Sequence, residues 1–319
     1  MLCAYGPAQP TLRPNSRRWP LDWLTVFCAF CALGVSAAPA QAQGGKLVLT
    51  GGVSSIDGAA GGGLSPWAVI GTPATEGQWG ATAFVTTVRT RDYALQVQGA
   101  ALAWNDRLEL SLARQDLNAR DNLAALGLRG LHLKQDIAGL KLRLAGDAVL
   151  DSDTLMPQIA VGWLHKSADP AALGATLSGA LGARLQGNEF YLSASKLFLA
   201  QGLLLNGTLR ATQANQNGLL GFGGANAGKS RLWPELSVVW LLSRQLALGA
   251  EVRFKPDNLN QSALGAGALK EDRWADVFVA WAPSPQLSLT LAWVDLGRIA
   301  PAVQPRRQTG AYLSLQVGI

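Results

Sequence analysis

The chain has 319 residues, an apolar share of 49%, 36 glycines, 11 tryptophans and a net charge of +6. No basic cluster is interleaved with aromatic residues, so this charge does not favour nucleic-acid binding. All three cysteines lie within the first 31 residues, and the chain contains no HExxH sequence. We therefore expect no disulfide, no metal site and no other cofactor in the remainder of the chain.

The first forty residues have the layout of a secretory signal peptide. Arg13, Arg17 and Arg18 precede an apolar run over residues 23–35, and an Ala-Gln-Ala sequence ends at Ala42. The run has about 13 residues, whereas a membrane-spanning helix needs about 20. We predict a signal peptide over residues 1–42, cleaved near Ala42, that exports the protein in a Gram-negative bacterium.

A glycine-rich segment, residues 43–76, follows the leader. Its glycines include Gly51, Gly52, Gly61, Gly62 and Gly63. Glycine weakens a strand and lets the chain bend tightly, so we do not count this segment as a strand. Trp67 and several aliphatic residues favour packing over disorder. We predict a plug or a periplasmic lid; a flexible linker is the alternative.

From residue 77 onwards, apolar residues recur at every second position. The pattern is clearest over residues 137–146, 246–255, 286–296 and 310–319. Successive side chains of a strand point to opposite faces, so one face of each segment is apolar and the other is polar or charged. No apolar stretch approaches 20 residues, which excludes membrane-spanning helices in this part of the chain.

This alternation predicts about twelve strands, each close to the length that crosses a bilayer at a tilt. They are residues 77–90, 92–104, 107–116, 137–146, 156–166, 188–197, 202–213, 233–243, 245–255, 273–282, 286–296 and 310–319. Short and long connections alternate, except at 89–92, which is short, and 147–155, which is long. We predict that residues 77–319 form an all-β, antiparallel, up-and-down transmembrane β-barrel of the outer membrane.

Tryptophan positions provide a second test, because aromatic rings collect at membrane interfaces. The predicted strand ends facing the periplasm carry Trp79, Trp104, Trp240 and Trp281. The predicted outer ends carry Trp163, Trp233, Trp274 and Trp293. We therefore expect two aromatic girdles.

The opening GGKLVLTGGVSSIDGAAGGGLSPWAVIG resembles the start of a proteobacterial family that is known only as a domain of unknown function and is grouped with outer-membrane barrels. The resemblance extends from Gly44 to Ile319. It implies an outer-membrane location and a barrel fold, and it supplies no activity. Many barrels end on Phe or Trp for recognition by the insertion machinery, and this chain departs from them by ending on Ile319.

The other face of the predicted strands carries charges of both signs. By parity the lumen-lining residues are Arg107, Glu109, Lys141, Arg143, Glu189, Arg210, Glu235, Glu251, Arg253, Lys255 and Asp276. Ion-pair ladders that fill a closed barrel and a wet pore with a weak anion preference both fit this mixture. Two alternative functions therefore remain at this point, a narrow channel for small solutes and a structural barrel without transport. The expected partners are outer-membrane lipids, the barrel-insertion machinery and small solutes.

Two motifs suggest chemistry, and neither has the context that its chemistry needs. Residues 223–230 satisfy GxxxxGK[ST], the phosphate-binding loop of nucleotide hydrolases, but no buried strand precedes them and Pro234 would break a following helix. The two histidines, His132 and His165, would be the bases of a lipid-modifying enzyme, but they lie in no recognisable motif. We predict that the protein is not an enzyme.

Overall fold

The computed structural model describes residues 46, 49, 51–148, 155–225, 227–260, 262 and 264–319. The predicted signal peptide lies outside these residues. Within them, no helix is both long and apolar enough to cross a membrane. The helical content consists of short turns, η1 (Ala124–Leu126), η2 (Ala171–Leu173), η3 (Thr176–Ala180), η4 (Leu199–Gln201) and η5 (Gln216–Gly218).

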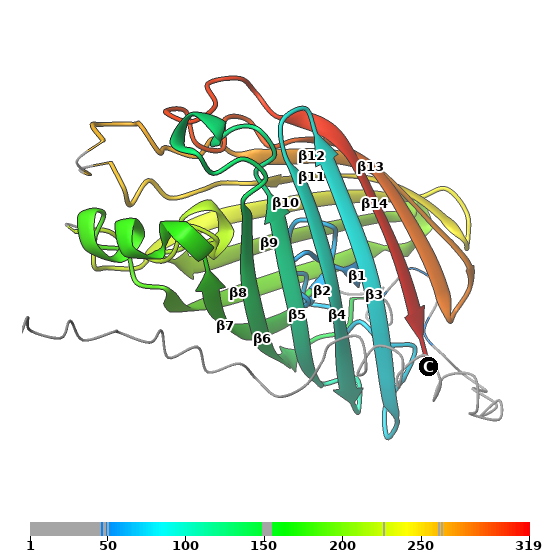
Figure 1. Ribbon diagram of the computed structural model, residues 1–319. Coiled ribbons are helices and arrows are strands. Elements are labelled where there is room, and N and C mark those ends of the chain that lie inside the picture. The colour runs from blue at the N-terminus through cyan, green and yellow to red at the C-terminus, as the bar shows by residue number, and fades with distance from the viewer. Residues whose placement is uncertain are drawn as a thin grey trace, which may run out of the picture. The chain divides into compact units, whose positions relative to one another are not determined.

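Twelve antiparallel strands form a closed barrel (Figure 1). In chain order they are β3 (Trp79–Thr90), β4 (Ala94–Trp104), β5 (Leu108–Asn118), β6 (His132–Ala145), β7 (Gln158–Asp169), β8 (Gln186–Phe198), β9 (Leu203–Thr212), β10 (Arg231–Leu241), β11 (Leu246–Arg253), β12 (Trp274–Ser284), β13 (Leu287–Asp295) and β14 (Thr309–Gly318). Each strand pairs with its neighbour in sequence, and β14 pairs with β3 to close the barrel. The predicted all-β barrel of twelve strands is confirmed.

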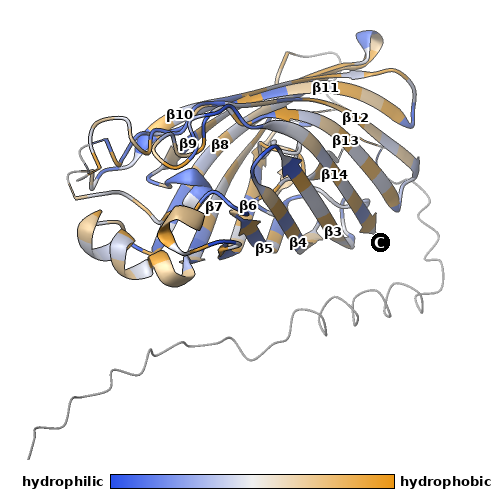
Figure 2. Ribbon diagram, turned by 45° about the horizontal axis from the view of Figure 1, so that its top comes forward, coloured by the Kyte–Doolittle hydropathy of each residue, from blue (hydrophilic) through white to orange (hydrophobic). Residues whose placement is uncertain are grey.

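Hydropathy alternates along the strands (Figure 2). The burial of the side chains turns this alternation into an outer and an inner face of the barrel. Aliphatic side chains at mid-strand, such as Leu236, Leu291 and Leu315, are about half exposed on the outside (53%, 57% and 48%). Such an exposed apolar band is what a barrel presents to lipid, and a soluble protein would cover it. The inner face carries the buried polar and charged side chains.

The two ends of the barrel differ in the length of their connections (Figure 1). At the end that holds the C-terminus, β4 and β5 are joined by residues 105–107, β10 and β11 by 242–245, and β12 and β13 by 285–286. At the opposite end, the long connections 119–131, 170–185, 213–230, 254–273 and 296–308 gather. We refer to the two ends as the terminal mouth and the loop end.

The sequence contains two connections that depart from this alternation of short and long links, and both are present in the structure. β3 and β4 are joined at the loop end by only Arg91, Asp92 and Tyr93, and the neighbouring loops pack onto this short hairpin. Asn122 donates to Asp92 O (2.8 Å), and Gln308 donates to the Asp92 carboxylate (2.8 Å). At the terminal mouth, residues 146–157 form a longer link, part of which lies outside the described residues.

The prediction of an outer tryptophan girdle is partly wrong. Trp79, Trp104, Trp240, Trp281 and Trp293 are exposed on the outer face. Trp274, by contrast, is only 5% exposed and points inward, because it shares its parity with the inward Asp276 two residues later. Trp233 likewise shares the parity of the buried Glu235.

The depth of the apolar band can be tested with two arginine substitutions on the same face. Leu315→Arg, at mid-strand, should cost about 2–4 kcal/mol of folding free energy, because the charge meets hydrocarbon. Gln96→Arg, exposed near the loop end of β4, should cost about 0–1 kcal/mol. Urea unfolding in lipid vesicles, followed by tryptophan fluorescence, measures both. A larger cost for Gln96→Arg than for Leu315→Arg would contradict the assigned depth.

Candidate functional site: the barrel interior

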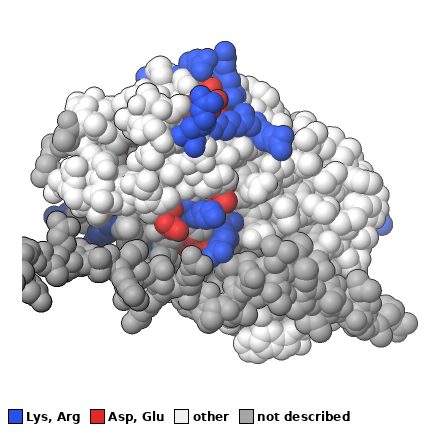
Figure 3. Space-filling view, viewed as in Figure 1, with Lys and Arg blue, Asp and Glu red and all other residues white. Residues whose placement is uncertain are grey.

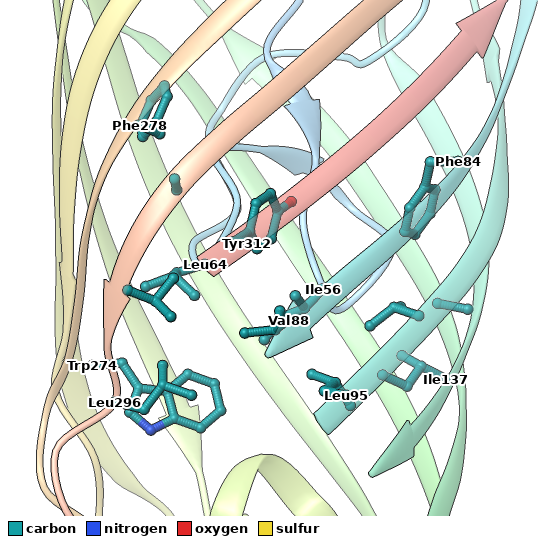
Figure 4. Packing of buried hydrophobic residues seen from close by; sticks show 14 of the residues in the cluster. Ile56, Leu64, Phe84, Val88, Leu95, Ile137, Trp274, Phe278, Leu296 and Tyr312 are labelled. Atoms are coloured by element: carbon teal, nitrogen blue, oxygen red, sulfur yellow. The ribbon is translucent and has the colours of Figure 1, made fainter. Parts of the chain in front are cut away.

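The glycine-rich residues 51–74, here called the interior segment, lie inside the barrel (Figures 1 and 4). They contain the two-residue strands β1 (Val53–Ser54) and β2 (Ala60–Gly61), which pair with each other and with no barrel strand. Ile56 and Leu64 are almost fully buried among wall side chains such as Val88 and Tyr312. The segment is therefore packed inside the wall and adds no strand to it.

Several glycines of this segment stand where no side chain would fit. A Cβ on Gly61 would lie 2.1 Å from Ser65 O, and one on Gly62 would lie 2.1 Å from Glu251 Oε1. Gly52 has a φ of +71°, and a Cβ there would clash with Gly61 O. Gly51 and Gly63 have looser neighbours, at 3.4 Å and 3.2 Å. The glycines thus let the segment approach its own backbone and the wall closely.

Two wall carboxylates hold the backbone of the interior segment. Glu109 of β5 accepts hydrogen bonds from Ala60 N and Gly71 N, both at 2.9 Å. Glu251 of β11 accepts from Leu64 N at 2.8 Å and from the indole of Trp67 at 3.3 Å. A carboxylate that accepts from backbone amides makes charge-assisted bonds, which are stronger than neutral ones.

Donors on the wall complement these acceptors. Lys141 of β6 donates to Ala60 O (2.7 Å) and Val69 O (2.9 Å), and its Nζ lies 3.2 Å from the Glu109 carboxylate. Gln158 of β7 donates to Ala68 O at 2.7 Å. Neutral contacts continue around the wall: Ala68 N donates to Ser195 of β8 (2.9 Å), Thr208 of β9 to Pro66 O (2.7 Å), and the Trp67 indole to Ser237 of β10 (2.9 Å).

A network of six charged residues surrounds the part of the interior segment that lies closest to the loop end. Asp57, the one charged residue between positions 47 and 75, lies 2.9 Å from Lys166 Nζ, 3.0 Å from an Arg210 nitrogen and 3.2 Å from one of Arg253. Two wall carboxylates complete the network. Glu189 contacts Lys166 and Arg210, and Glu235 contacts Arg210 and Arg253. Three carboxylates therefore balance three cations, all of them buried.

One of the long connections at the loop end also contacts this charge network. Residues 213–230, the β9–β10 loop, bring Asn217 into the barrel, where its amide donates to Asp57 at 2.9 Å. Lys166 and Arg253 both donate to the side-chain oxygen of Asn217, at 3.1 Å and 2.8 Å. Gln216 and Asn217 have φ angles of +45° and +61°, a tight turn that turns the loop inward. Asn217 thus joins this loop to the interior segment through its hydrogen bond to Asp57.

The residues predicted to line the lumen take three kinds of position. Most are at most 8% exposed and face inward: Glu109, Lys141, Glu189, Arg210, Glu235, Glu251, Arg253, Lys255 and Asp276. Arg143 is half-buried at the terminal mouth, paired with Asp106 (2.5 Å) and Asp147 (3.3 Å). Arg107 does not lie among them, because it belongs to the turn 105–107, beyond the start of β5, and its side chain is exposed.

Lys255 lies just beyond β11, under the loops. Its Nζ is 3.1 Å from the centre of the Trp274 ring and 3.7 Å from the Glu271 carboxylate. Burial lowers the pKa of Lys255 well below its usual range, and burial raises the pKa of Glu271. Loss of hydration therefore outweighs the attraction of this loose ion pair for both groups.

Sequence reasoning missed three central residues. Asp57 is the lone charge of an otherwise neutral segment, which is a signal that could have been used. Lys166 has the inward parity of Leu164. The sequence predicts that this strand ends at residue 166, whereas β7 extends to Asp169. Asn217 carries no local signal, because its position depends on how the long loop folds back.

Three small pockets lie among the described residues of the interior and the terminal mouth. Two pockets of about 20 and 30 Å³ are apolar: one lies between Trp67 and Phe278, the other beneath the loops beside Trp274. A third, of about 60 Å³, opens at the terminal mouth between Gly51, Thr72 and Gly318. A single water needs roughly 10–15 Å³. Each of these three pockets therefore has room for only a few waters.

The sequence motifs for chemistry are not assembled. The described residues between Gly223 and Ser230 form no helix. His165 of β7 lies on the outer face beside Asn188 (3.0 Å), while the neighbouring Ser167 accepts from Gln186. His132, the first residue of β6, contacts Asp116 at 2.5 Å on the exposed exterior. Among the described residues, no group of three or more His, Cys, Asp or Glu side chains could hold a metal ion.

The importance of Asp57 can be tested against an exposed acidic residue. Asp57→Asn leaves three buried cations with two carboxylates, and should weaken docking of the interior segment by about 3–5 kcal/mol. Asp121→Asn removes a surface pair with Arg129, exposed at both ends, and should change stability by about 0–1 kcal/mol. Hydrogen exchange at the amides of Ala60, Leu64 and Gly71 reports docking. Equal exchange in the two variants would contradict the network's role.

Several solved structures of outer-membrane barrels have a similar fold. They include the KdgM porin (7% identity, TM-score 0.46, covering 74% of this chain and 98% of that one). An outer-membrane channel from Pseudomonas putida F1 has 12% identity and a TM-score of 0.46 over 77% of this chain and 96% of that one. A Salmonella typhi outer-membrane phospholipase, solved as a dimer with bound calcium, has 10% identity and a TM-score of 0.39 over 74% and 90%. These likenesses concern the fold alone.

Sequence comparison adds one match. A family model described as "Protein of unknown function (DUF3034)" matches residues 50–316. No curated protein matches the chain.

Proposed function

The chain belongs to the DUF3034 family of proteins of unknown function, and we propose that it is an outer-membrane channel for small solutes that the interior segment holds closed. The observation that carries the proposal is the path of that segment. It enters and leaves at the terminal mouth, so it can withdraw without being unthreaded from the barrel.

The two ends of the interior segment lie side by side. A Cβ on Gly51 would be 3.4 Å from Ile70 O and 3.9 Å from Thr72 O. Pro73 and Thr72 in turn lie against Gly318 and Gly80, which belong to strand ends at the terminal mouth. Withdrawal toward this mouth breaks side-chain and backbone contacts inside the lumen and no strand pairing of the barrel.

The contacts that hold the segment suit reversible docking. Wall groups such as Glu109, Lys141 and Ser195 are hydrogen-bonded to it, and water can replace each of these bonds. Once the segment withdraws, the wall that remains presents polar and charged side chains beside apolar ones such as Phe84 and Phe278, and the polar groups can bind water in the open lumen. A structural barrel with no transport, the second function, would keep this interior permanently dry.

The charges left on the wall favour anions weakly. When Asp57 leaves with the interior segment, Lys166, Arg210 and Arg253 face only Glu189 and Glu235. This leaves an excess of one positive charge within this cluster, while Glu251 and its register partner Asp276 add negative charge elsewhere on the inner wall. A single charge among mixed signs gives a preference and not strict selection.

Closure can be tested by a reversible crosslink. Ser195 Oγ lies 2.9 Å from Ala68 N, so this wall residue contacts the segment, and a disulfide between Ala68→Cys and Ser195→Cys would tie the two together. Under applied voltage in planar bilayers, the wild type should open, the oxidised variant should stay closed, and reduction should restore openings.

The matched control is Thr86→Cys with Ser314→Cys, a crosslink within the wall between hydroxyls 2.7 Å apart. It should conduct in both redox states. A variant lacking residues 46–74 should conduct continuously. If neither the wild type nor this variant conducts, although both are folded, the barrel is structural and the channel proposal fails.

Selectivity gives a separate prediction for the variant lacking residues 46–74. Its reversal potential in a KCl gradient should show a weak anion preference, with a permeability ratio of roughly 2. Arg253→Gln in the same background should abolish that preference by removing the excess charge. Lys134→Gln, on the outside of the barrel, is the charge-matched control and should leave the reversal potential unchanged. Cation preference in the parent variant would contradict the assignment.

A further inference from the structure

Arginines gather at the loop end of β14, β3 and β4, on the outside of the barrel (Figure 3). This rim patch consists of Arg89, Arg91, Arg120, Arg306 and Arg307, together with the carboxylates Asp92 and Asp295. Arg89 ends the outward row of β3, Arg91 and Asp92 belong to the short β3–β4 hairpin, and the remaining arginines come from the two loops that pack on that hairpin. The patch thus joins three separate parts of the chain.

The carboxylates neutralise only part of this charge. Arg306 pairs with Asp92 at 3.1 Å, and Arg307 pairs with Asp295. Among the described residues, Arg89, Arg91 and Arg120 contact no carboxylate, and an Arg120 nitrogen lies 3.4 Å from Arg91 O. Five guanidinium groups therefore share two acids. A bound anion would relieve the repulsion among them.

The surface below the patch is apolar. The outward row of β3 descends from Arg89 through Thr87 to Val85, and each faces a residue of β14: Ala311, Leu313 and Leu315. Val85, Leu313 and Leu315 are each between 43% and 48% exposed. A ligand on this face thus meets guanidinium groups at one end and an aliphatic surface along the rest.

We propose that the rim patch binds the phosphorylated headgroup of an outer-leaflet glycolipid, whose acyl chains lie along β3 and β14. Guanidinium groups match phosphate with paired N–H donors, and they are more weakly hydrated than ammonium groups. A lipid is favoured over a free phosphate, because Arg89 lies at the boundary of the apolar band and the aliphatic row continues directly beneath it. The proposal relies on the outer-membrane orientation of the proposed function and is independent of conductance.

Binding can be measured on the full chain with defined lipids. Purified protein in detergent is titrated with a bisphosphorylated glucosamine-based lipid, and the complex is detected by native mass spectrometry. The triple variant Arg89→Gln, Arg91→Gln, Arg120→Gln should bind at least tenfold more weakly than the wild type. Raising the salt concentration should weaken the wild-type complex and have little effect on that of the variant.

The matched control removes three exposed basic groups at the same end but on the other side of the barrel: Lys229→Gln, Arg231→Gln, Lys270→Gln. It should bind within about twofold of the wild type. The dephosphorylated lipid should bind the wild type as weakly as the phosphorylated lipid binds the patch variant. All variants should keep the heat-dependent gel shift of a folded barrel.

Three results would overturn the proposal. Equal losses in the patch and control variants would indicate non-specific attraction to positive charge. Equal binding of phosphorylated and dephosphorylated lipid would show that phosphate is not recognised. Full competition by inorganic pyrophosphate, with the same affinity as the lipid, would identify a soluble polyanion as the ligand. A variant that conducts but does not bind lipid shows that the channel proposal can hold while lipid binding fails. A variant that binds lipid but does not conduct shows the opposite.

Discussion

The interior of this barrel is governed by the cost of leaving a buried polar group without a partner. The inner wall carries carboxylates, ammonium groups and guanidinium groups from at least seven strands, and each would be expensive to bury alone. The wall strands cannot satisfy these groups with their own backbones, because strand pairing already uses those amides and carbonyls. The interior segment supplies what is missing. Its irregular backbone has free N–H and C=O groups, which meet Glu109, Glu251 and Lys141.

The need for free backbone N–H and C=O groups inside the barrel explains why the segment is rich in glycine. Regular strands would satisfy their own backbones and leave the wall unsatisfied. A glycine-rich chain can turn every few residues, present amides in several directions and approach a carboxylate closely, as Gly62 does beside Glu251. The apolar side chains of the segment then fill the gaps between polar contacts, with Trp67 serving both purposes through its ring and its indole N–H.

Much of this fold could be predicted from the sequence, because a barrel strand follows a two-residue rule. Parity placed Glu109, Glu251 and Arg253 on one face, and the same rule, had it been applied to Trp274, would have placed it inward as well. The contacts of the interior could not be predicted. Which wall carboxylate meets which amide depends on the three-dimensional path of an irregular segment, and no period in the sequence encodes that path. Asn217 is the clearest case, since its loop turns inward through two residues with positive φ.

The hydrogen bond between Asn217 and Asp57 connects the two ends of the barrel. A loop at one end and a segment anchored at the other share the same partners, Lys166 and Arg253. By thermodynamic linkage, the free energy by which a docked segment favours one arrangement of the loop equals the free energy by which that arrangement favours docking. Contacts confined to the loop end can therefore alter the stability of a segment that is anchored at the terminal mouth.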